Sequence, residues 1–178
     1  MHYERFDDME HLGFRRIANE LPGQVQSRFA QSAVTSDDTF RITVEKLKPK
    51  IAVEIGTFCG VSTLVLADIA EHVHTFDVTE RTSTYANWDL FKLRPKITYY
   101  ICPQGREQIK NGLENINADF AFIDAVHDYP NVKADFELCK RFGRVLFHDA
   151  EFEGVKKFLH EIKAEFINKD FAYWEEKA

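Results

Sequence analysis

The chain has 178 residues, of which 44% are hydrophobic and 29% are charged, and this composition excludes a disordered, repetitive or low-complexity protein. Its formal charge of -6 argues against a nucleic-acid partner, because binding to a phosphate backbone requires a clustered basic surface. The three cysteines form no C-x-x-C pair, so neither a zinc knuckle nor a disulfide framework is expected. No apolar run approaches the ~20 residues that span a bilayer, and the N-terminus lacks a signal-peptide pattern. We therefore expect a cytoplasmic protein without a membrane partner.

The chain is expected to form one structural unit that begins with a helical extension over residues 1–49. His11–Leu21 has the pattern of one helix, and Ser36 is a suitable N-cap for a second helix over Asp37–Leu47. We expect this extension to cover the core of the main domain, residues 50–178. Lining of a substrate site and dimerisation remain alternative roles for it.

From residue 50 onward, short apolar runs alternate with longer segments of helical period. The apolar runs predict buried strands at Ile51–Ile55, Val73–Asp77, Ile97–Cys102, Phe120–Asp124 and Val145–His148. The segments after them predict helices at Gly60–Ala70, Tyr85–Leu93, Arg106–Leu113, Pro130–Arg141 and Gly154–Phe166. This alternation predicts an α/β fold, with a Rossmann-like, doubly wound and mostly parallel sheet flanked by helices.

Two glycines and an acid predict a ligand site at the ends of the first two strands. Gly56 and Gly60 follow the first strand, where a parallel sheet places its ligand crevice and where glycine lets a ligand approach the backbone. Asp77 ends the second strand, and 77 minus 56 gives 21 positions. An acid about 20 residues after such a loop accepts hydrogen bonds from ribose hydroxyls.

The loop pattern disfavours a pyrophosphate ligand. The dinucleotide fingerprint is G-x-G-x-x-G, whereas this chain has G-x-x-x-G-x-S with Phe58 in place of the second glycine. A P-loop would need Gly-Lys-Ser/Thr, which is absent. A ligand with a ribose but no phosphate remains possible, and so does a ligand-free sheet whose glycines only pack the first helix.

The segment from Ile51 to Leu64 resembles the E-x-G-x-x-x-G motif of class I S-adenosylmethionine-dependent methyltransferases, most of all the catechol and caffeoyl-CoA O-methyltransferases. The resemblance implies S-adenosylmethionine as the cofactor. It places Gly56 and Gly60 against the methionine part, with Ser62 at the carboxylate and Glu54 orienting the amino group.

The same resemblance extends to the rest of the cofactor. It places Thr57 and Phe58 beside the cofactor and Asp77 on its ribose. Gln104, on the loop after the third strand, would lie where the enzymes of this family enclose the adenine.

Two downstream motifs point to chemistry at the same edge of the sheet. Phe122-Ile-Asp-Ala-Val-His-Asp-Tyr129 ends the fourth strand, and Val145-Leu-Phe-His-Asp149 ends the fifth. Because adjacent parallel strands end at one edge, their polar side chains are expected to converge. The pair resembles the F-I-D-x-x-H-x-Y and H-D motifs of small-molecule methyltransferases, including sugar O-methyltransferases of antibiotic pathways.

This second resemblance implies a divalent cation, Mg²⁺ or Mn²⁺, held by Asp124, His148 and Asp149. Carboxylates suit Mg²⁺, and a histidine beside them tolerates Mn²⁺ or Fe²⁺ as well. The catechol branch has Asp-Asn where this chain has Asp149-Ala150, so the third ligand is open unless His148 replaces it. Capping of the following helix is the alternative role of Asp149. His127 stands where catechol-type enzymes have a lysine and is the candidate general base; fixing the loop is its alternative role.

The sequence thus predicts a methyltransferase that acts on a small-molecule acceptor, at a hydroxyl. The alternatives are a binding protein that keeps the fold without turnover and, less favoured, an NAD-dependent oxidoreductase. Class I domains end in an antiparallel hairpin, but only Asn168–Ala178 follows the last predicted helix, enough for one strand around Phe171–Trp174. We therefore expect a shortened C-terminal end. Two alternatives are open, a homo-oligomer in which a partner supplies the missing strand and a sheet that ends early.

Overall fold

The computed structural model describes residues 39–177. The predicted helix His11–Leu21 lies outside the described residues, as do Ser36 and the first two residues of the predicted helix Asp37–Leu47. The rest of this second helix is confirmed as α3 (Thr39–Leu47). Its buried residues Phe40 and Val44 are four positions apart and so share the face that packs on the sheet.

The predicted alternation of strands and helices is confirmed, with bounds that differ by at most three residues except in the last helix. The parallel strands are β1 (Ile51–Ile55), β2 (His72–Asp77), β3 (Ile97–Ile101), β4 (Phe120–Ile123) and β5 (Arg144–Phe147). The helices that follow them are α4 (Val61–Ile69), α5 (Thr82–Leu90), α6 (Arg106–Leu113), α7 (Tyr129–Cys139) and α8 (Glu153–Glu161). Two short 3-10 helices, η3 (Arg94–Lys96) and η4 (Lys140–Phe142), precede β3 and β5.

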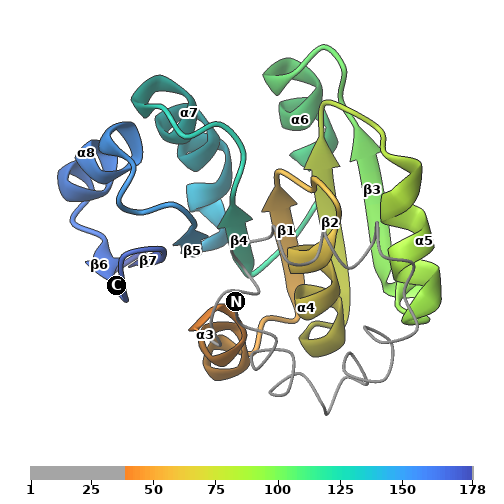
Figure 1. Cartoon of the computed structure of the whole chain (residues 1–178). Coiled ribbons are helices and arrows are strands. Elements are labelled where there is room, and N and C mark those ends of the chain that lie inside the picture. Colours follow the sequence, from red (N-terminus) through yellow and green to blue (C-terminus); the bar gives the residue numbers. More distant parts are fainter. Residues whose placement is uncertain (1–38, 178) are drawn as a thin grey trace, which may run out of the picture.

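The described strands form one sheet in the order β3-β2-β1-β4-β5-β7-β6. Figure 1 shows this order from β3 at the right to β6 and β7 at the left. The pairs among β1 to β5 are all parallel. The chain steps outward from β1 to β3 and then restarts at β4, so the topological switch point lies between β1 and β4. The predicted Rossmann-like fold is confirmed.

The C-terminal end differs from the prediction. The last helix was expected to continue to Phe166, but α8 ends at Glu161 because Lys163 takes a left-handed backbone conformation with φ of 56°. The next residues form β6 (Glu165–Phe166), which pairs antiparallel with β7 (Ala172–Glu175). β7 in turn pairs antiparallel with β5. The chain therefore supplies its own, short hairpin, and a partner is not needed to complete the sheet.

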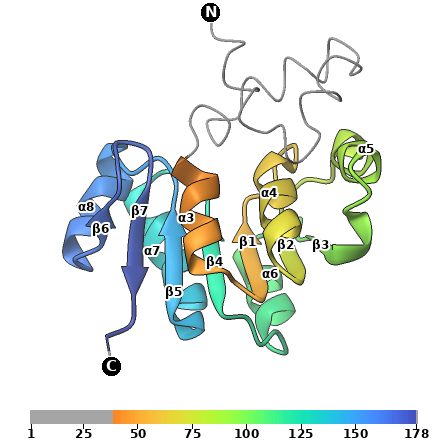
Figure 2. The ribbon, with the colours of Figure 1, turned by 90° about the horizontal axis from the view of Figure 1, so that it is seen from below.

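Helices cover both faces of the sheet because alternate residues of its inner strands are apolar on both sides. In β4, Phe120 and Phe122 belong to the core beneath α3, α4 and α5, whereas Ala121 and Ile123 belong to the core beneath α6, α7 and α8. Figure 2 shows the three layers. Within residues 39–177, no helix is long and apolar enough to cross a bilayer.

Candidate functional site

The glycine loop between β1 and α4 has the backbone that its sequence requires. Gly56 and Gly60 both have positive φ, 101° and 75°. A Cβ on Gly56 would lie 2.1 Å from the carbonyl oxygen of Asp124, and one on Gly60 would lie 2.5 Å from Nε1 of Trp88. Both glycines are therefore explained by close packing within the chain, whether or not a ligand is bound.

Helix α5 holds the glycine loop through three side-chain hydrogen bonds, a feature that the sequence analysis missed. Thr84 Oγ1 donates to the carbonyl of Phe58 at 3.0 Å, Asn87 Nδ2 to that of Cys59 at 3.0 Å, and Trp88 Nε1 to that of Gly60 at 3.1 Å. The three donors are buried. No motif indicates these bonds, because a donor in a distant helix carries no local sequence signal.

Asp77, at the end of β2, lies directly beside the glycine loop. Its Oδ2 accepts hydrogen bonds from the Phe58 amide at 2.8 Å and from Arg81 Nη1 at 3.1 Å, and its Oδ1 accepts one from the Thr79 amide at 2.9 Å. A carboxylate offers about four lone-pair positions, so one acceptor position remains on Oδ1. Asp77 thus holds the loop and can still accept a hydrogen bond from a ribose hydroxyl.

Glu54 and Ser62 are bonded to each other beneath the loop. The fully buried Glu54 carboxyl accepts hydrogen bonds from the hydroxyls of Ser62, Thr63 and Thr75. Burial raises the pKa of Glu54 to about 7, although these three hydrogen bonds act to lower it. In this arrangement both side chains serve an internal network, and their predicted contacts with a cofactor remain predictions.

The other predicted cofactor residues differ in exposure. Thr57 is buried, and its hydroxyl lies 2.6 Å from that of Thr75. Phe58 is 52% exposed, and the Arg81 guanidinium lies over its ring. Gln104 is exposed after β3, and its amide donates to the side chain of Gln108. Of these three, Phe58 and Gln104 are therefore open to a ligand at the edge of the sheet.

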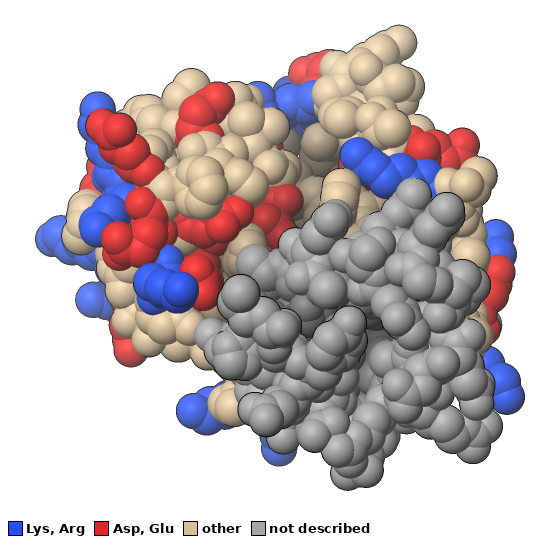
Figure 3. Space-filling model, viewed as in Figure 1, with Lys and Arg blue, Asp and Glu red and all other residues tan. Residues whose placement is uncertain are grey.

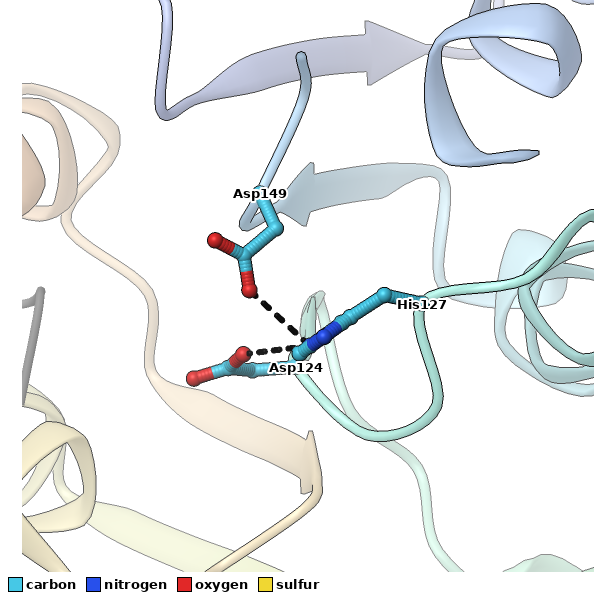
Figure 4. A group of neighbouring side chains, drawn as sticks. All are labelled: Asp124, His127 and Asp149. Carbon is cyan, nitrogen blue, oxygen red and sulfur yellow. Dashed lines mark ion pairs between the residues drawn. The ribbon is translucent and has the colours of Figure 1, made fainter. Parts of the chain in front are cut away.

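A second group of side chains meets where β4 and β5 end. Asp124 directly follows β4, His127 lies on the loop to α7, and His148 and Asp149 directly follow β5. His127 Nε2 lies 2.9 Å from Asp149 Oδ2 and 3.5 Å from Asp124 Oδ1 (Figure 4). His148 Nδ1 lies 3.0 Å from Asp124 Oδ1 and 3.2 Å from Asp149 Oδ2. The predicted convergence of these four side chains is confirmed, whereas their chemical roles remain predictions.

The two acids shift the pKa values of the two histidines. The carboxylate of Asp124, followed by that of Asp149, raises the pKa of His127 to about 9. Burial acts to lower the pKa of His148, but the same carboxylates raise it to about 10. Burial acts to raise the pKa of Asp149, yet both histidines hold it well below its usual value. A raised pKa opposes the role of general base, because a general base must start without its proton.

The backbone around this second group holds it in place. Asp149 has a φ of 53°, a left-handed conformation that Asp and Asn tolerate better than most residues. Its side chain does not cap α8, whose N-cap is Phe152, so that alternative is excluded. A Cβ on Gly154 would lie 2.6 Å from the Tyr129 nitrogen, so the start of α8 packs closely against the start of α7. Phe152 lies beside His127, with ring centroids 5.2 Å apart.

The donor set fits a divalent cation. Asp124, His127 and Asp149 offer ligand atoms that all lie within 4.8 Å of one another, and each of these side chains is partly buried. Two carboxylates and one imidazole are common ligands for such ions. Figure 3 shows acidic side chains bordering a hollow between the α7/α8 side and the α6 side of the molecule.

The fold and the motifs together define a methyltransferase-like domain of the Rossmann type, and the comparison with protein families agrees. Residues 53–150, more than half of the chain, match the family model described as "Methyltransferase domain". The chain therefore belongs to this methyltransferase domain family. No curated protein matches it in sequence.

Solved structures of low sequence identity share the fold. An O-methyltransferase from Bacillus cereus in complex with SAH has a TM-score of 0.67 and 18% identity, covering 94% of this chain and 90% of that one. The O-methyltransferase TomG from Streptomyces achromogenes, involved in tomaymycin synthesis and in complex with SAM, has a TM-score of 0.63 and 18% identity, covering 97% and 89%. SAH-bound PaMTH1 from Podospora anserina has a TM-score of 0.64 and 15% identity, covering 98% and 88%.

Proposed function

We propose that this protein is an S-adenosylmethionine-dependent methyltransferase that methylates a hydroxyl of a small-molecule acceptor. One observation carries the proposal, the contact between Gly56 and the Asp124 carbonyl. It places the glycine loop of the methyltransferase motif next to the group of acids and histidines that can prepare a hydroxyl for attack. A cofactor methyl group and an acceptor oxygen can then meet at one edge of the sheet.

The cofactor assignment is supported by the open acceptor position on Asp77 and by exposed Phe58 beside it. The three similar structures described above are in complex with SAH or SAM, which share the adenosine part that such a site would hold. When bound, S-adenosylmethionine supplies an electrophilic methyl group. The chain's own residues then have to orient the nucleophile in line with that group, which is where most of the acceleration of such a reaction arises.

The assignment of a small-molecule acceptor is supported by the exposure of the second group of side chains and by the net charge of the chain. Asp124, His127 and Asp149 are 18–35% exposed, which suits contact with a small molecule. A net charge of -6 does not favour a nucleic-acid acceptor. A divalent cation held by these residues would lower the pKa of an acceptor hydroxyl, and this group is where we place removal of its proton.

The cofactor part of the proposal is tested by thermal unfolding in the presence of S-adenosylmethionine, S-adenosylhomocysteine or NAD. A ligand that binds only the native state raises the melting temperature, and the rise grows with the logarithm of its concentration relative to its Kd. We expect both sulfur ligands to raise it and NAD to leave it unchanged. No shift with either sulfur ligand would overturn the assignment, and a shift with NAD alone would favour an oxidoreductase.

Turnover is tested separately, with a methyl-labelled cofactor and a panel of phenols, catechols and sugars. We expect transfer of the label to at least one hydroxyl compound. Cofactor binding without transfer to any member of the panel would favour the alternative of a binding protein with this fold.

A further inference from the structure

We propose that His127, together with Asp124 and Asp149, binds a first-row transition ion in preference to Mg²⁺, and that His148 is a positioning residue that donates a hydrogen bond to the two carboxylates. This moves the ligand role that the resemblance implied for His148 to His127, and it gives His148 a positioning role. The proposal deepens the proposed methyltransferase function and rests on it for its catalytic meaning.

The first argument concerns the two nitrogen atoms of His148. Its side chain is 5% exposed, and its Nδ1 faces Asp124 and Asp149. Its Nε2 is buried and has no hydrogen-bond partner among the described residues. If Nδ1 bound a metal ion, the proton would have to move to Nε2, where this N–H would be buried without an acceptor. A buried unpaired donor is costly, so the favoured arrangement keeps the proton on Nδ1, where it is donated to Asp124.

The second argument concerns Nε2 of His127. This atom is also buried, and it lies within 3.5 Å of a carboxylate oxygen of both Asp124 and Asp149. Despite these distances it makes no hydrogen bond of acceptable geometry with either oxygen. Its other ring nitrogen is not left buried without a partner, so that nitrogen can carry the proton when Nε2 acts as a ligand. His127 can therefore bind an ion through Nε2 without leaving a buried, unpaired N–H on its other ring nitrogen, whereas His148 cannot do so through Nδ1.

The third argument is the spacing of the donor atoms. Ligands about 2.1 Å from a common ion lie roughly 3.0 Å apart in octahedral and roughly 3.4 Å apart in tetrahedral coordination. His127 Nε2 lies 2.9 Å and 3.5 Å from the two carboxylate oxygens, close to these separations, and all three donor atoms lie within 4.8 Å of one another. The three ligands follow β4 and β5, which anchor them on the rigid part of the sheet.

The kind of ion follows from the kind of donor. Mg²⁺ prefers oxygen ligands and binds through carboxylates and water, whereas imidazole nitrogen favours ions such as Mn²⁺, Fe²⁺, Co²⁺ and Zn²⁺. His148, held between the rings of Phe122 and Phe171, would act as the outer partner that orients a ligating carboxylate. Loss of such a partner commonly weakens metal binding 10–100-fold without changing the donor atoms.

The test measures binding of Mn²⁺ and of Mg²⁺ by calorimetry, and the nitrogen coupling of bound Mn²⁺ by pulsed electron paramagnetic resonance. Four proteins are compared: wild type, His127→Gln, His148→Gln and, as a matched control, His160→Gln, whose histidine is exposed on α8. In the wild type and the control we expect Mn²⁺ to bind at least tenfold more tightly than Mg²⁺, with coupling to one imidazole nitrogen. His127→Gln should lose both the preference and the coupling, whereas His148→Gln should bind both ions more weakly and keep both.

The opposite pattern, in which His148→Gln loses the coupling and His127→Gln keeps it, would overturn the assignment of His127 as the ligand. Absence of Mn²⁺ binding in the wild type would overturn the site itself, and equal affinity for both ions would overturn the preference for a transition ion. The melting temperature of each apo variant shows whether it folds. Thermal shifts with S-adenosylmethionine, measured without metal on the same samples, separate the two proposals: a shift without Mn²⁺ binding rejects only this inference, and Mn²⁺ binding without a shift rejects only the proposed cofactor.

Discussion

Gly56 and Asp124 approach so closely that a β-carbon on the glycine would lie 2.1 Å from the aspartate carbonyl oxygen and 2.6 Å from its carbonyl carbon. The loop after β1 and the loop after β4 therefore touch through their backbones. The first carries the proposed cofactor contacts, and the second begins the group of acids and histidines. The relative position of these two loops therefore depends on Gly56, where no side chain separates the two backbones.

This contact predicts that Gly56→Ala destabilises the protein by several kcal/mol, because the substitution combines a steric clash with a backbone φ of 101°. Gly143→Ala is the matched control. Gly143 also has a positive φ, 79°, but a Cβ there would meet nothing within 4 Å, so about 1 kcal/mol is expected. Urea unfolding measures both. Equal losses in the two variants would show that the contact with Asp124 relaxes at little cost.

Asp77→Ala is expected to weaken S-adenosylmethionine binding by roughly 10–100-fold, the worth of a hydrogen bond to a charged group. The variant removes the acceptor for a ribose hydroxyl and also the bond that holds the Phe58 amide. Calorimetry measures the affinity. Asp89→Ala is the control, since Asp89 pairs with Arg94 on the exposed surface and should leave the affinity unchanged. An unaltered affinity in Asp77→Ala would rule out the ribose contact.

The raised pKa of Glu54 predicts a pH dependence of stability. Its pKa is about 7 in the folded chain and 4.5 as the ordinary value, so between these pH values the folded state retains a proton that the unfolded state has lost. Stability from this residue is therefore fully present below pH 4.5, falls as the pH rises towards 7, and then levels off. At about 1.4 kcal/mol per pKa unit, the loss is roughly 3 kcal/mol.

Glu54→Gln isolates this contribution, because an amide can bond the same hydroxyls but does not titrate. Urea unfolding at pH 5 and pH 8 should show that the free energy of unfolding falls more in the wild type than in the variant, by about 2–3 kcal/mol. The histidines near Asp124 titrate in both proteins, so their effect cancels in the difference. Parallel pH profiles would show that Glu54 keeps an ordinary pKa when folded.

Much of the fold was predictable, because the inner strands are short and apolar and because the apolar residues of the helices recur at helical spacing. The structure of the C-terminal end was not predictable. Residues 163–166 continue the apolar spacing of α8, and only the left-handed turn at Lys163, followed by pairing of Phe166 with Ala172, ends the helix. A hairpin strand of two residues is fixed by its partners in the sheet, which local sequence cannot report.

The candidate site, too, was predictable from the sequence only in part. The positions of Asp77, Asp124 and Asp149 at the edge of the sheet follow from the topology, so their sequence motifs located them. The direction of each ring nitrogen of His127 and His148 depends on side-chain packing, and no motif specifies it. For that reason the sequence predicted that both histidines lie at the site, but it could not indicate which of them is oriented to bind a cation.

The bonds from α5 to the glycine loop give the last prediction. Trp88→Phe keeps an aromatic ring in the core but removes the donor to the Gly60 carbonyl, which is held at 3.1 Å. We expect a loss of about 1–3 kcal/mol in stability, because the Gly60 carbonyl loses one of its two donors and keeps only the Leu64 amide. We also expect weaker binding of S-adenosylmethionine, because the loop loses one of its restraints. Tyr85→Phe on the same helix is the control, since its hydroxyl bonds the exposed Glu80. Urea unfolding and calorimetry measure the two effects separately. A loss of stability with unchanged cofactor affinity would mean that α5 only supports folding and does not shape the loop for its ligand.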